Sequence, residues 1–351
     1  MNSEPAQKRA LSSAAPAARL IDLRPDTGTF RDDVLRGLTS PTKRIPPKYF
    51  YDDRGSALFD RITRLPEYYP TRTEIGILEA HAADLGELMG RQWELIELGS
   101  GSSRKVRILL DAASGAGTYL PIDISREALL AAANRVAREY PHVRVVAVCA
   151  DYTRPLTLKR QNPVARRIVF FPGSTIGNLE PEQAASFMSN VGAVLRPGDL
   201  FIVGVDLQKD PSVLHDAYND SSGVTAKFNG NLLDRMNREL GASFDRRRFE
   251  HVAFYDVPQG RIEMHLRSLS DQTVRVAGTE IRFRAKETIH TENSYKYTRE
   301  GFRALAEAAG LRERAVWTDS ERLFSVWILA PSGGAGASAP AGHGSGRGRE
   351  S

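Results

Sequence analysis

Between residues 93 and 207 the chain alternates short apolar runs with amphipathic stretches. The apolar runs are of strand length and lie at 93–98, 118–123, 143–151, 166–173 and 196–207. Helical stretches follow at 105–113, after Ser125 and from Pro181; we expect the Ser125 hydroxyl to cap its helix. Strands that alternate with helices predict a parallel sheet covered on both faces.

A different pattern begins after residue 208. Residues 209–248 are helical and polar, and 250–290 form short alternating segments separated by Gly-containing turns, which is typical of antiparallel strands. A helix at 297–311 and strands at 315–320 and 323–330 then resume the first pattern. We therefore predict a doubly wound α/β sheet with an inserted α+β domain.

The composition is that of an ordinary globular protein, with 351 residues, 41% hydrophobic and 26% charged. The single cysteine, Cys149, excludes an intrachain disulfide framework and a cysteine-rich zinc site. No histidines stand at metal-ligand spacing, so no metal is expected. No apolar run reaches the roughly 18 residues of a membrane span, and the N-terminal stretch lacks the apolar core of a signal peptide. These features predict a cytoplasmic protein without a membrane partner.

The net charge of +5 argues only weakly for a nucleic-acid partner. Residues 1–19 carry +2 of it and residues 331–351 carry +1, and both ends have the small, polar composition of disordered tails. A nucleic-acid-binding protein usually carries its excess charge on a folded face. We expect no nucleic-acid partner.

A glycine turn follows the first predicted strand. Gly99 and Gly101 lie between that strand and a helix, where free backbone N–H groups can approach a ligand. A tight turn without a ligand is the alternative. Arg104 stands where a dinucleotide fingerprint requires its third glycine, which weakens an NAD-binding interpretation.

Acidic residues end the next two strands. Asp123 lies 24 residues after Gly99, a distance that suits a carboxylate binding ribose hydroxyls, and Asp151 is followed by Tyr152, which can cover an adenine ring. Each has an ordinary alternative: a helix-capping aspartate for Asp123 and a surface loop for the pair. Together the three strand ends favour an adenosine cofactor without a pyrophosphate, such as S-adenosylmethionine (SAM).

The fourth strand ends in the segment PGSTIGN at 172–178. Thr175 occupies the position where a serine hydrolase needs its nucleophile, which disfavours a hydrolase. Asn178 can contact a polar substrate or cap a helix. Three loops, 48–53, 64–74 and 290–298, are rich in tyrosine and polar residues, and surface packing is the alternative to a site.

Several motifs occur in an order that identifies a family. They are PPKYFYDDRGSALFDRITRLPEYYPTRTE, ELGSGSSRK, PIDIS, FFPGSTIGNLEP, DAYNDSSGVTAKFN, RIEM and TENSYKY. The chain resembles the histidine-specific, SAM-dependent methyltransferases of ergothioneine biosynthesis from about Phe30 to about Ala330. The resemblance implies a Rossmann-like SAM-binding domain with an inserted substrate-binding domain. The expected parts are a tail (1–19), a substrate-binding part (20–71), the SAM-binding domain (72–208), the insert (209–296), the end of the SAM-binding domain (297–330) and a second tail (331–351).

The resemblance also implies the site. The positions that match SAM-binding residues are Gly99, Lys105, Asp123, Asp151 and Tyr152. Those that match histidine-binding residues are Tyr51, Tyr68, Asn178, Tyr218, Met264, Glu292 and Ser294. The implied reaction places three methyl groups on the α-amine of histidine and gives hercynine. It is a direct displacement that requires no metal and no catalytic side chain, and we expect a monomer.

Two other functions and one structural alternative stay open. The chain can methylate another amino acid or a nucleic acid, or it can be a binding module without activity. Glu292 and Ser294, at i and i+2 of an extended segment, share one face and can contact an imidazole. Lys296 lies on that face too, so a structural Glu292–Lys296 ion pair is the alternative.

Overall fold

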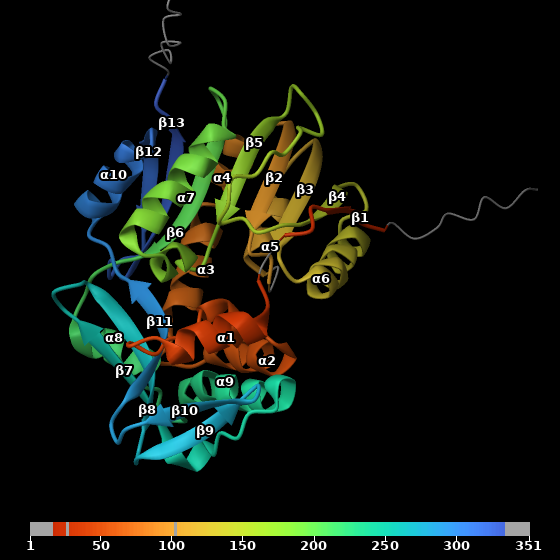
Figure 1. The fold of residues 1–351 in the computed structure, drawn as a ribbon. Helices are drawn as coiled ribbons and strands as arrows, with labels where there is room; N and C mark the ends of the chain where they lie inside the picture. The colour runs from red at the N-terminus through yellow and green to blue at the C-terminus, as the bar shows by residue number, and fades with distance from the viewer. Residues whose placement is uncertain (1–16, 26–27, 102–103, 334–351) are drawn as a thin grey trace, which may run out of the picture.

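A large mixed sheet forms the upper part of the molecule in Figure 1. The structure is a computed structural model that describes residues 17–25, 28–101 and 104–333. Eight strands lie in the order β1-β4-β3-β2-β5-β6-β13-β12, and all neighbours are parallel except β13, which is antiparallel to both β6 and β12. The strands are β1 (Arg19–Asp22), β2 (Gln92–Leu98), β3 (Ala116–Asp123), β4 (Arg144–Cys149), β5 (Arg166–Phe171), β6 (Leu200–Asp206), β12 (Leu311–Thr318) and β13 (Phe324–Pro331).

Helices cover both faces of this sheet. One face packs against α3 (Tyr69–Ala80), α4 (Ala82–Met89), α5 (Arg104–Ala112) and α6 (Arg126–Glu139). The other packs against α7 (Pro181–Ala193) and α10 (Arg299–Ala308). Every residue of β6 is buried, as expected for a central strand with apolar layers on both sides.

The predicted strands and helices of this sheet are confirmed, with two differences. Ser125 precedes α6, but its hydroxyl makes no capping bond; its backbone N–H instead donates to the Asp123 carboxylate. The edge strand β1 was not predicted. It has only four residues, half of them charged, and pairs through its backbone with β4.

The segment between β6 and α10 forms the lower part of the molecule. It contains α8 (Pro211–Tyr218), α9 (Val224–Leu240) and a short helix, η3 (Arg246–Arg248). Two antiparallel sheets follow: β7 (Phe249–Asp256), β8 (Arg261–Ser268) and β11 (Thr288–Tyr295) form one, and β9 (Gln272–Val276) and β10 (Thr279–Phe283) the other. The antiparallel pattern predicted for 250–290 is confirmed, and β11 leads back toward the large sheet.

The N-terminal segment packs on this insert. It forms α1 (Phe30–Thr39), η1 (Pro47–Phe50) and α2 (Asp53–Ile62), and its apolar side chains share one core with α8, α9 and strands β7 to β11. The rings of Phe50 and Phe228 stack with centroids 4.5 Å apart. The division into domains stays a prediction, and its boundary at residue 71 falls inside α3.

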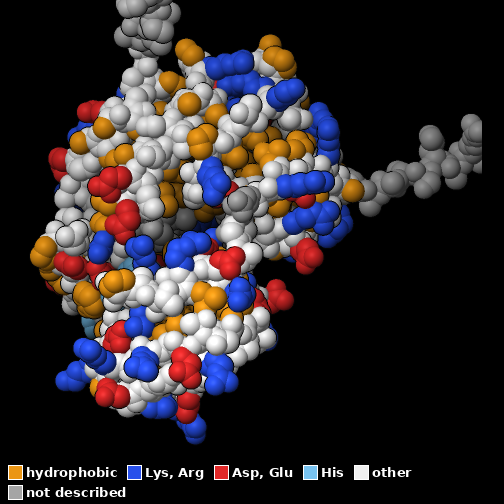
Figure 2. Space-filling model, in the orientation of Figure 1, with side chains coloured by type: hydrophobic (Ala, Val, Ile, Leu, Met, Phe, Trp, Pro, Cys, Tyr) orange, Lys and Arg blue, Asp and Glu red, His pale blue; other side chains and the backbone are white. Residues whose placement is uncertain are grey.

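Both predicted tails lie mostly outside the described residues, and β1 and β13 reach into their inner ends at Arg19 and Pro331. Among the described helices none has the length and apolar character to cross a membrane. Figure 2 shows that the surface is hollowed between the two parts of the molecule.

Candidate functional site

The first group of predicted site residues lies at the carboxyl ends of β2, β3 and β4. Gly99 follows β2 with φ +73°, a conformation that favours glycine, and a Cβ atom there would lie 3.4 Å from the Tyr152 hydroxyl. Tyr152 packs edge-on against Phe171, with ring centroids 5.7 Å apart. The negative charges of Asp123 and Asp151 both act on Tyr152 and, after burial, raise the pKa of its hydroxyl. These residues, which the sequence spreads over 54 positions, therefore meet at one edge of the sheet.

The two acids of this group differ in their surroundings. Burial raises the pKa of Asp123, which accepts hydrogen bonds from the backbone and has no ion-pair partner among the described residues. Asp151 accepts from the backbone N–H and the hydroxyl of Thr153, at 3.0 and 2.6 Å, and lies 3.4 Å from Arg154. Asp123 thus keeps more capacity to bind a hydroxyl-bearing ligand.

Lys105 is held at the same edge by an acid that the sequence analysis missed. Its ammonium pairs with Glu74, which is fully buried and also accepts from the Gly173 backbone N–H at 2.9 and 3.0 Å. Glu74 ends the motif EYYPTRTE and lies on the buried face of α3. The one sequence signal that could have found it is a carboxylate flanked by the apolar positions of a helix, because acids are rarely buried without a partner.

A second missed acid is Glu97, near the end of β2 and two residues before Gly99. It accepts a hydrogen bond from the Tyr119 hydroxyl, and burial raises its pKa to about 7. The charge of Lys105 lowers this pKa and that of Asp123 raises it, so Glu97 lies within reach of both. The sequence places an acid before the glycine turn, but it does not show that the side chain is buried there.

The second group of predicted residues gathers on β11. Glu292 lies opposite Met264 of β8, and Ser294 lies opposite Ile262; a bulge between His290 and Glu292 leaves the alternation at 292–294 intact. Both side chains therefore point to the same face, as the extended pattern predicted. Glu292 is 8% exposed, and burial raises its pKa to about 7.

Three tyrosines from distant segments face this strand. The Tyr218 hydroxyl donates to the Ser294 Oγ at 2.8 Å, and the Tyr68 and Tyr218 rings lie 6.4 Å apart. Tyr51 is 45% exposed as a whole residue, but its ring packs against Phe59 and Phe228 and its hydroxyl is buried. Burial and the negative charge of Glu292 raise the pKa of all three hydroxyls, which places them around one carboxylate. The segment after β5 joins the two groups: a Cβ on Gly173 would lie 3.4 Å from the Lys105 ammonium, and one on Gly177 would lie 2.6 Å from the Tyr295 carbonyl oxygen of β11. The two groups therefore adjoin where the upper and lower parts of the molecule meet, which Figure 2 shows as a cleft.

Asn178 lies beside β11 in the short helix η2 (Thr175–Asn178). Its side chain makes no hydrogen bond with any residue the structure describes, and the N-cap of α7 is Glu180 instead. The helix-capping alternative for Asn178 is therefore wrong. Its neighbour Gly177 packs so closely on β11 that a Cβ would lie 2.6 Å from the Tyr295 carbonyl oxygen.

The alternative ion pair between Lys296 and Glu292 is also wrong. The Lys296 ammonium pairs with Asp206 Oδ2 at 2.7 Å, and both side chains are 1% exposed. Lys209 also forms an ion pair with Asp206, and the Tyr69 hydroxyl donates a hydrogen bond to it. Burial alone would raise the pKa of Asp206, but the two lysine charges outweigh it and lower that pKa. Glu292 is left without a side-chain hydrogen bond or ion pair among the described residues.

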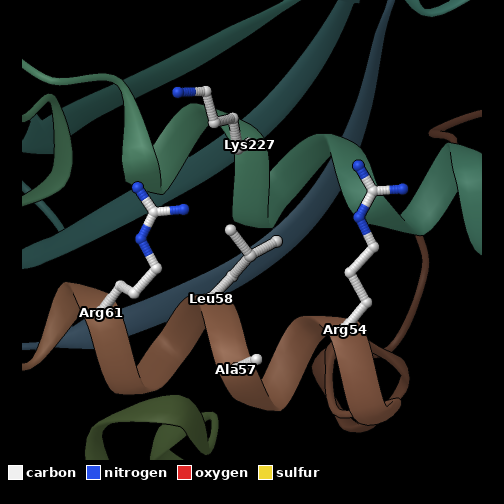
Figure 3. Close-up of a pocket in the computed structure, with 5 residues that line it drawn as sticks. All are labelled: Arg54, Ala57, Leu58, Arg61 and Lys227. Carbon is white, nitrogen blue, oxygen red and sulfur yellow. The ribbon is translucent and has the colours of Figure 1, made fainter.

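Two other features lie apart from these groups. A hollow of about 310 Å³ between α2 and α9 is lined by Arg54, Ala57, Leu58, Arg61 and Lys227 (Figure 3), none of them a predicted site residue. Glu263, His265 and His290, on the opposite face of β8 and β11 from Glu292, have possible metal-ligand atoms within 4.8 Å of one another. Arg261 occupies one Glu263 oxygen there, which leaves a poor cation site.

The two adjoining groups of residues can hold two small molecules side by side, which suits the transfer of a chemical group from one to the other. A model of the SAM-dependent, histidine-specific methyltransferases matches residues 30–331. The chain belongs to this family. SAM is thus the cofactor of this methyltransferase, and the fold and family expected from the sequence are confirmed.

Sequence relatives agree with this family. The methyltransferase is 47% identical over 301 residues to the histidine N-alpha-methyltransferase of Mycolicibacterium smegmatis, covering 84% of this chain and 93% of that one. It is 45% identical over 305 residues to the protein of that name from Mycobacterium tuberculosis, covering 86% and 94%. It is 34% identical to ergothioneine biosynthesis protein 1 of Neurospora crassa over 83% of this chain, which spans 33% of that longer protein.

Proposed function

We propose that the enzyme transfers three methyl groups from SAM to the α-amine of L-histidine and so makes hercynine, the first step of ergothioneine biosynthesis. The observation that carries this proposal is the carboxylate of Glu292, which is buried beside Ser294, faces a cluster of tyrosines and has no partner among the described residues. A buried charge without a partner is costly unless a ligand supplies one. The imidazole N–H of histidine is such a partner.

The residues at the carboxyl edge of the sheet fit SAM. Asp123 has unused acceptor capacity for the ribose hydroxyls. Because Gly99 has no side chain, a ligand has room beside the Tyr152 ring. Asp151 and Lys105 border the same space as hydrogen-bonding and charged groups. SAM supplies a methyl group on a positively charged sulfur, which makes that methyl electrophilic.

The residues around β11 and η2 fit histidine. Glu292 accepts from one ring nitrogen and Ser294 contacts the other, with Met264 packed beside them. The amide of Asn178 has no hydrogen bond within the described part of the chain, and we assign it, with the Tyr218 hydroxyl, to the α-amine and carboxylate. The rings of Tyr51 and Tyr68 border the amine.

Positioning is the main contribution of the protein to the reaction. An α-amine has a pKa of about 8, so a useful fraction is unprotonated near neutral pH without a strong base. Holding amine, methyl and sulfur in line supplies most of the acceleration. The aromatic rings stabilise the amine as it becomes permanently cationic, by about 0.5–2 kcal/mol. Reaction ends after three transfers because the nitrogen then has no lone pair.

We further propose that the enzyme acts as a monomer in the cytoplasm on free histidine and its mono- and dimethylated forms, without a nucleic-acid or membrane partner. The support is the buried setting of Glu292 among tyrosine hydroxyls, which suits a small polar molecule, and the low net charge of the folded body.

The test is incubation of the protein with SAM and, separately, each of the common amino acids and a bulk RNA, followed by mass spectrometry. We expect gains of one, two and three methyl groups on histidine alone. Methylation of another amino acid or of RNA, with histidine unchanged, would overturn the proposed substrate. SAM binding without any methyl transfer would indicate a binding module.

A further inference from the structure

Lys296 is held rigidly behind the residues assigned to the imidazole. It follows β11 directly, and its side chain is 1% exposed. Its backbone N–H donates to the Gly260 carbonyl at 2.8 Å, and its own carbonyl accepts from the Gln208 side chain at 3.2 Å. The lysine is therefore fixed at its backbone as well as at its ammonium.

Each proton of the Lys296 ammonium has an acceptor. The nitrogen lies 2.7 Å from Asp206 Oδ2, 2.9 Å from the Ser294 Oγ and 3.2 Å from the Tyr218 hydroxyl. An ammonium has three donors and no acceptor. Lys296 thus has no hydrogen-bonding capacity left for a ligand, and its influence on a substrate must pass through these neighbours.

Among these neighbours, Ser294 has its hydrogen-bonding role restricted most by Lys296. Its oxygen accepts from Lys296 and, at 2.8 Å, from the Tyr218 hydroxyl, so both of its lone pairs are occupied. The only remaining capacity of Ser294 is to donate its own proton. Glu292, two residues earlier on the same face, offers acceptors alone when it is ionised. The strand therefore presents one donor and one acceptor to the ring.

We propose that Lys296 is a positioning residue that fixes Ser294 as a hydrogen-bond donor, so that the pocket selects a neutral imidazole with one N–H and one bare nitrogen. The inference rests on the proposed function, because it assumes that a histidine ring binds between Glu292 and Ser294. An imidazolium would bring a second N–H against the Ser294 proton and is disfavoured. A ring that has an N–H but no bare nitrogen leaves the Ser294 donor unpaired.

Substrate analogues test the role assigned to the bare nitrogen. The two pyrrolylalanine isomers keep an N–H and replace one or the other bare nitrogen of the ring by C–H. We expect the wild type to prefer histidine over the better isomer, in kcat/KM, by on the order of 10- to 100-fold, since a buried unpaired donor is costly. In Lys296→Met the Ser294 proton is free to turn toward Tyr218, so most of this preference should be lost.

Lys209→Met is the matched control, because Lys209 contacts the same Asp206 but makes no hydrogen bond to Ser294 among the described residues. It should lower stability without changing the histidine-to-pyrrolylalanine ratio. An unchanged ratio in a folded Lys296→Met protein, or an equal change in both variants, would overturn the proposal. Histidine methylation by the wild type is measured in the same assay, so failure of the proposed function is seen separately.

A measurement on the wild type covers the case in which Lys296→Met does not fold. Histidine labelled with ¹⁵N in the ring is bound in the presence of S-adenosylhomocysteine at about pH 6, where the free imidazole is mostly protonated. The proposal predicts one protonated and one bare ring nitrogen in the complex. Two protonated nitrogens would contradict it.

Discussion

Asp123 is partly buried and Glu292 is buried, and neither has a cationic partner among the described residues. Burial raises the pKa of each, so each costs folding free energy when it ionises. Asp206 differs from them, because two lysines pair with it and compensate for the burial of its charge. The two unpaired acids lie one in each group of the cleft, which is where two ligands would supply the missing donors.

Removing Asp123 should weaken the binding of SAM. The Asp123→Ala variant loses charge-assisted contacts to the ribose, worth about 1.5–3 kcal/mol. Histidine binding without SAM should change much less. Calorimetry on this variant and on Asp123→Asn, which keeps the shape and loses the charge, measures the effect. Wild-type SAM affinity in both variants would remove Asp123 from the site.

Removing Glu292 should abolish the preference for histidine. A site built to hydrogen-bond a substrate N–H discriminates strongly through that bond, so the ratio of kcat/KM for histidine over tryptophan should fall on the order of 10- to 100-fold in Glu292→Ala. Melting temperatures show whether the variant is folded. If a folded Glu292→Ala protein keeps the wild-type ratio, the assignment of Glu292 is wrong.

Glu292 should also make stability depend on pH. Its folded pKa of about 7 lies above the ordinary 4.5, so the protonated form is favoured in the folded state and stability is lost as pH rises through 7. Relative to Glu292→Gln, the wild type should lose up to about 3 kcal/mol between roughly pH 4.5 and 7, at 1.36 kcal/mol per unit. Urea unfolding of both proteins without ligands measures this. A difference that does not vary with pH would show that Glu292 ionises normally.

Among the elements, the contact between η2 and β11 sets the distance between Asn178 and the residues that we assign to the imidazole, Glu292 and Ser294. Gly177 makes this contact, and a Cβ there would lie 2.6 Å from the Tyr295 carbonyl oxygen. We expect Gly177→Ala to push η2 away and to lower kcat/KM for histidine by about 10- to 100-fold, because small misplacements are costly in catalysis. SAM affinity should stay within about twofold of wild type.

Gly76→Ala is the control for this substitution. Gly76 is exposed on α3, and a Cβ atom added there would have nothing within 4 Å, so alanine should stabilise the helix by about 0.5–1 kcal/mol and leave kinetics unchanged. If Gly177→Ala behaves like this control, the η2–β11 contact does not position Asn178.

The elements themselves were largely predictable from the sequence. Buried parallel strands such as β6 are continuous apolar runs, and the amphipathic pattern of α10 is equally clear. The strand β1 was missed because it has only four residues, two of them charged, and so forms no apolar run; its pairing with β4 uses backbone groups, which any sequence offers. The capping role expected for the Ser125 hydroxyl was wrong because the turn after β3 is closed by the Asp123 carboxylate instead.

At the scale of the whole molecule, the site depends on how the N-terminal segment and the insert come together. Tyr51 and Tyr68 lie between β1 and β2 in the chain, whereas Tyr218 and Glu292 follow β6, yet the shared core brings all four around one space. Periodicity predicts none of this, and the family resemblance alone placed these residues together. The pairings of Glu74 with Lys105 and of Lys296 with Asp206 were not predicted because both are buried contacts between distant segments.

We propose that one cleft performs every methyl transfer to the α-amine of histidine. The most direct measurement offers Nα,Nα-dimethylhistidine with SAM to the wild type, follows the product by mass spectrometry and measures its competition with histidine. We predict that dimethylhistidine gains one methyl group, gives the same trimethylated product and competes with histidine for binding. A dimethylhistidine that is neither methylated nor competes with histidine would contradict the claim.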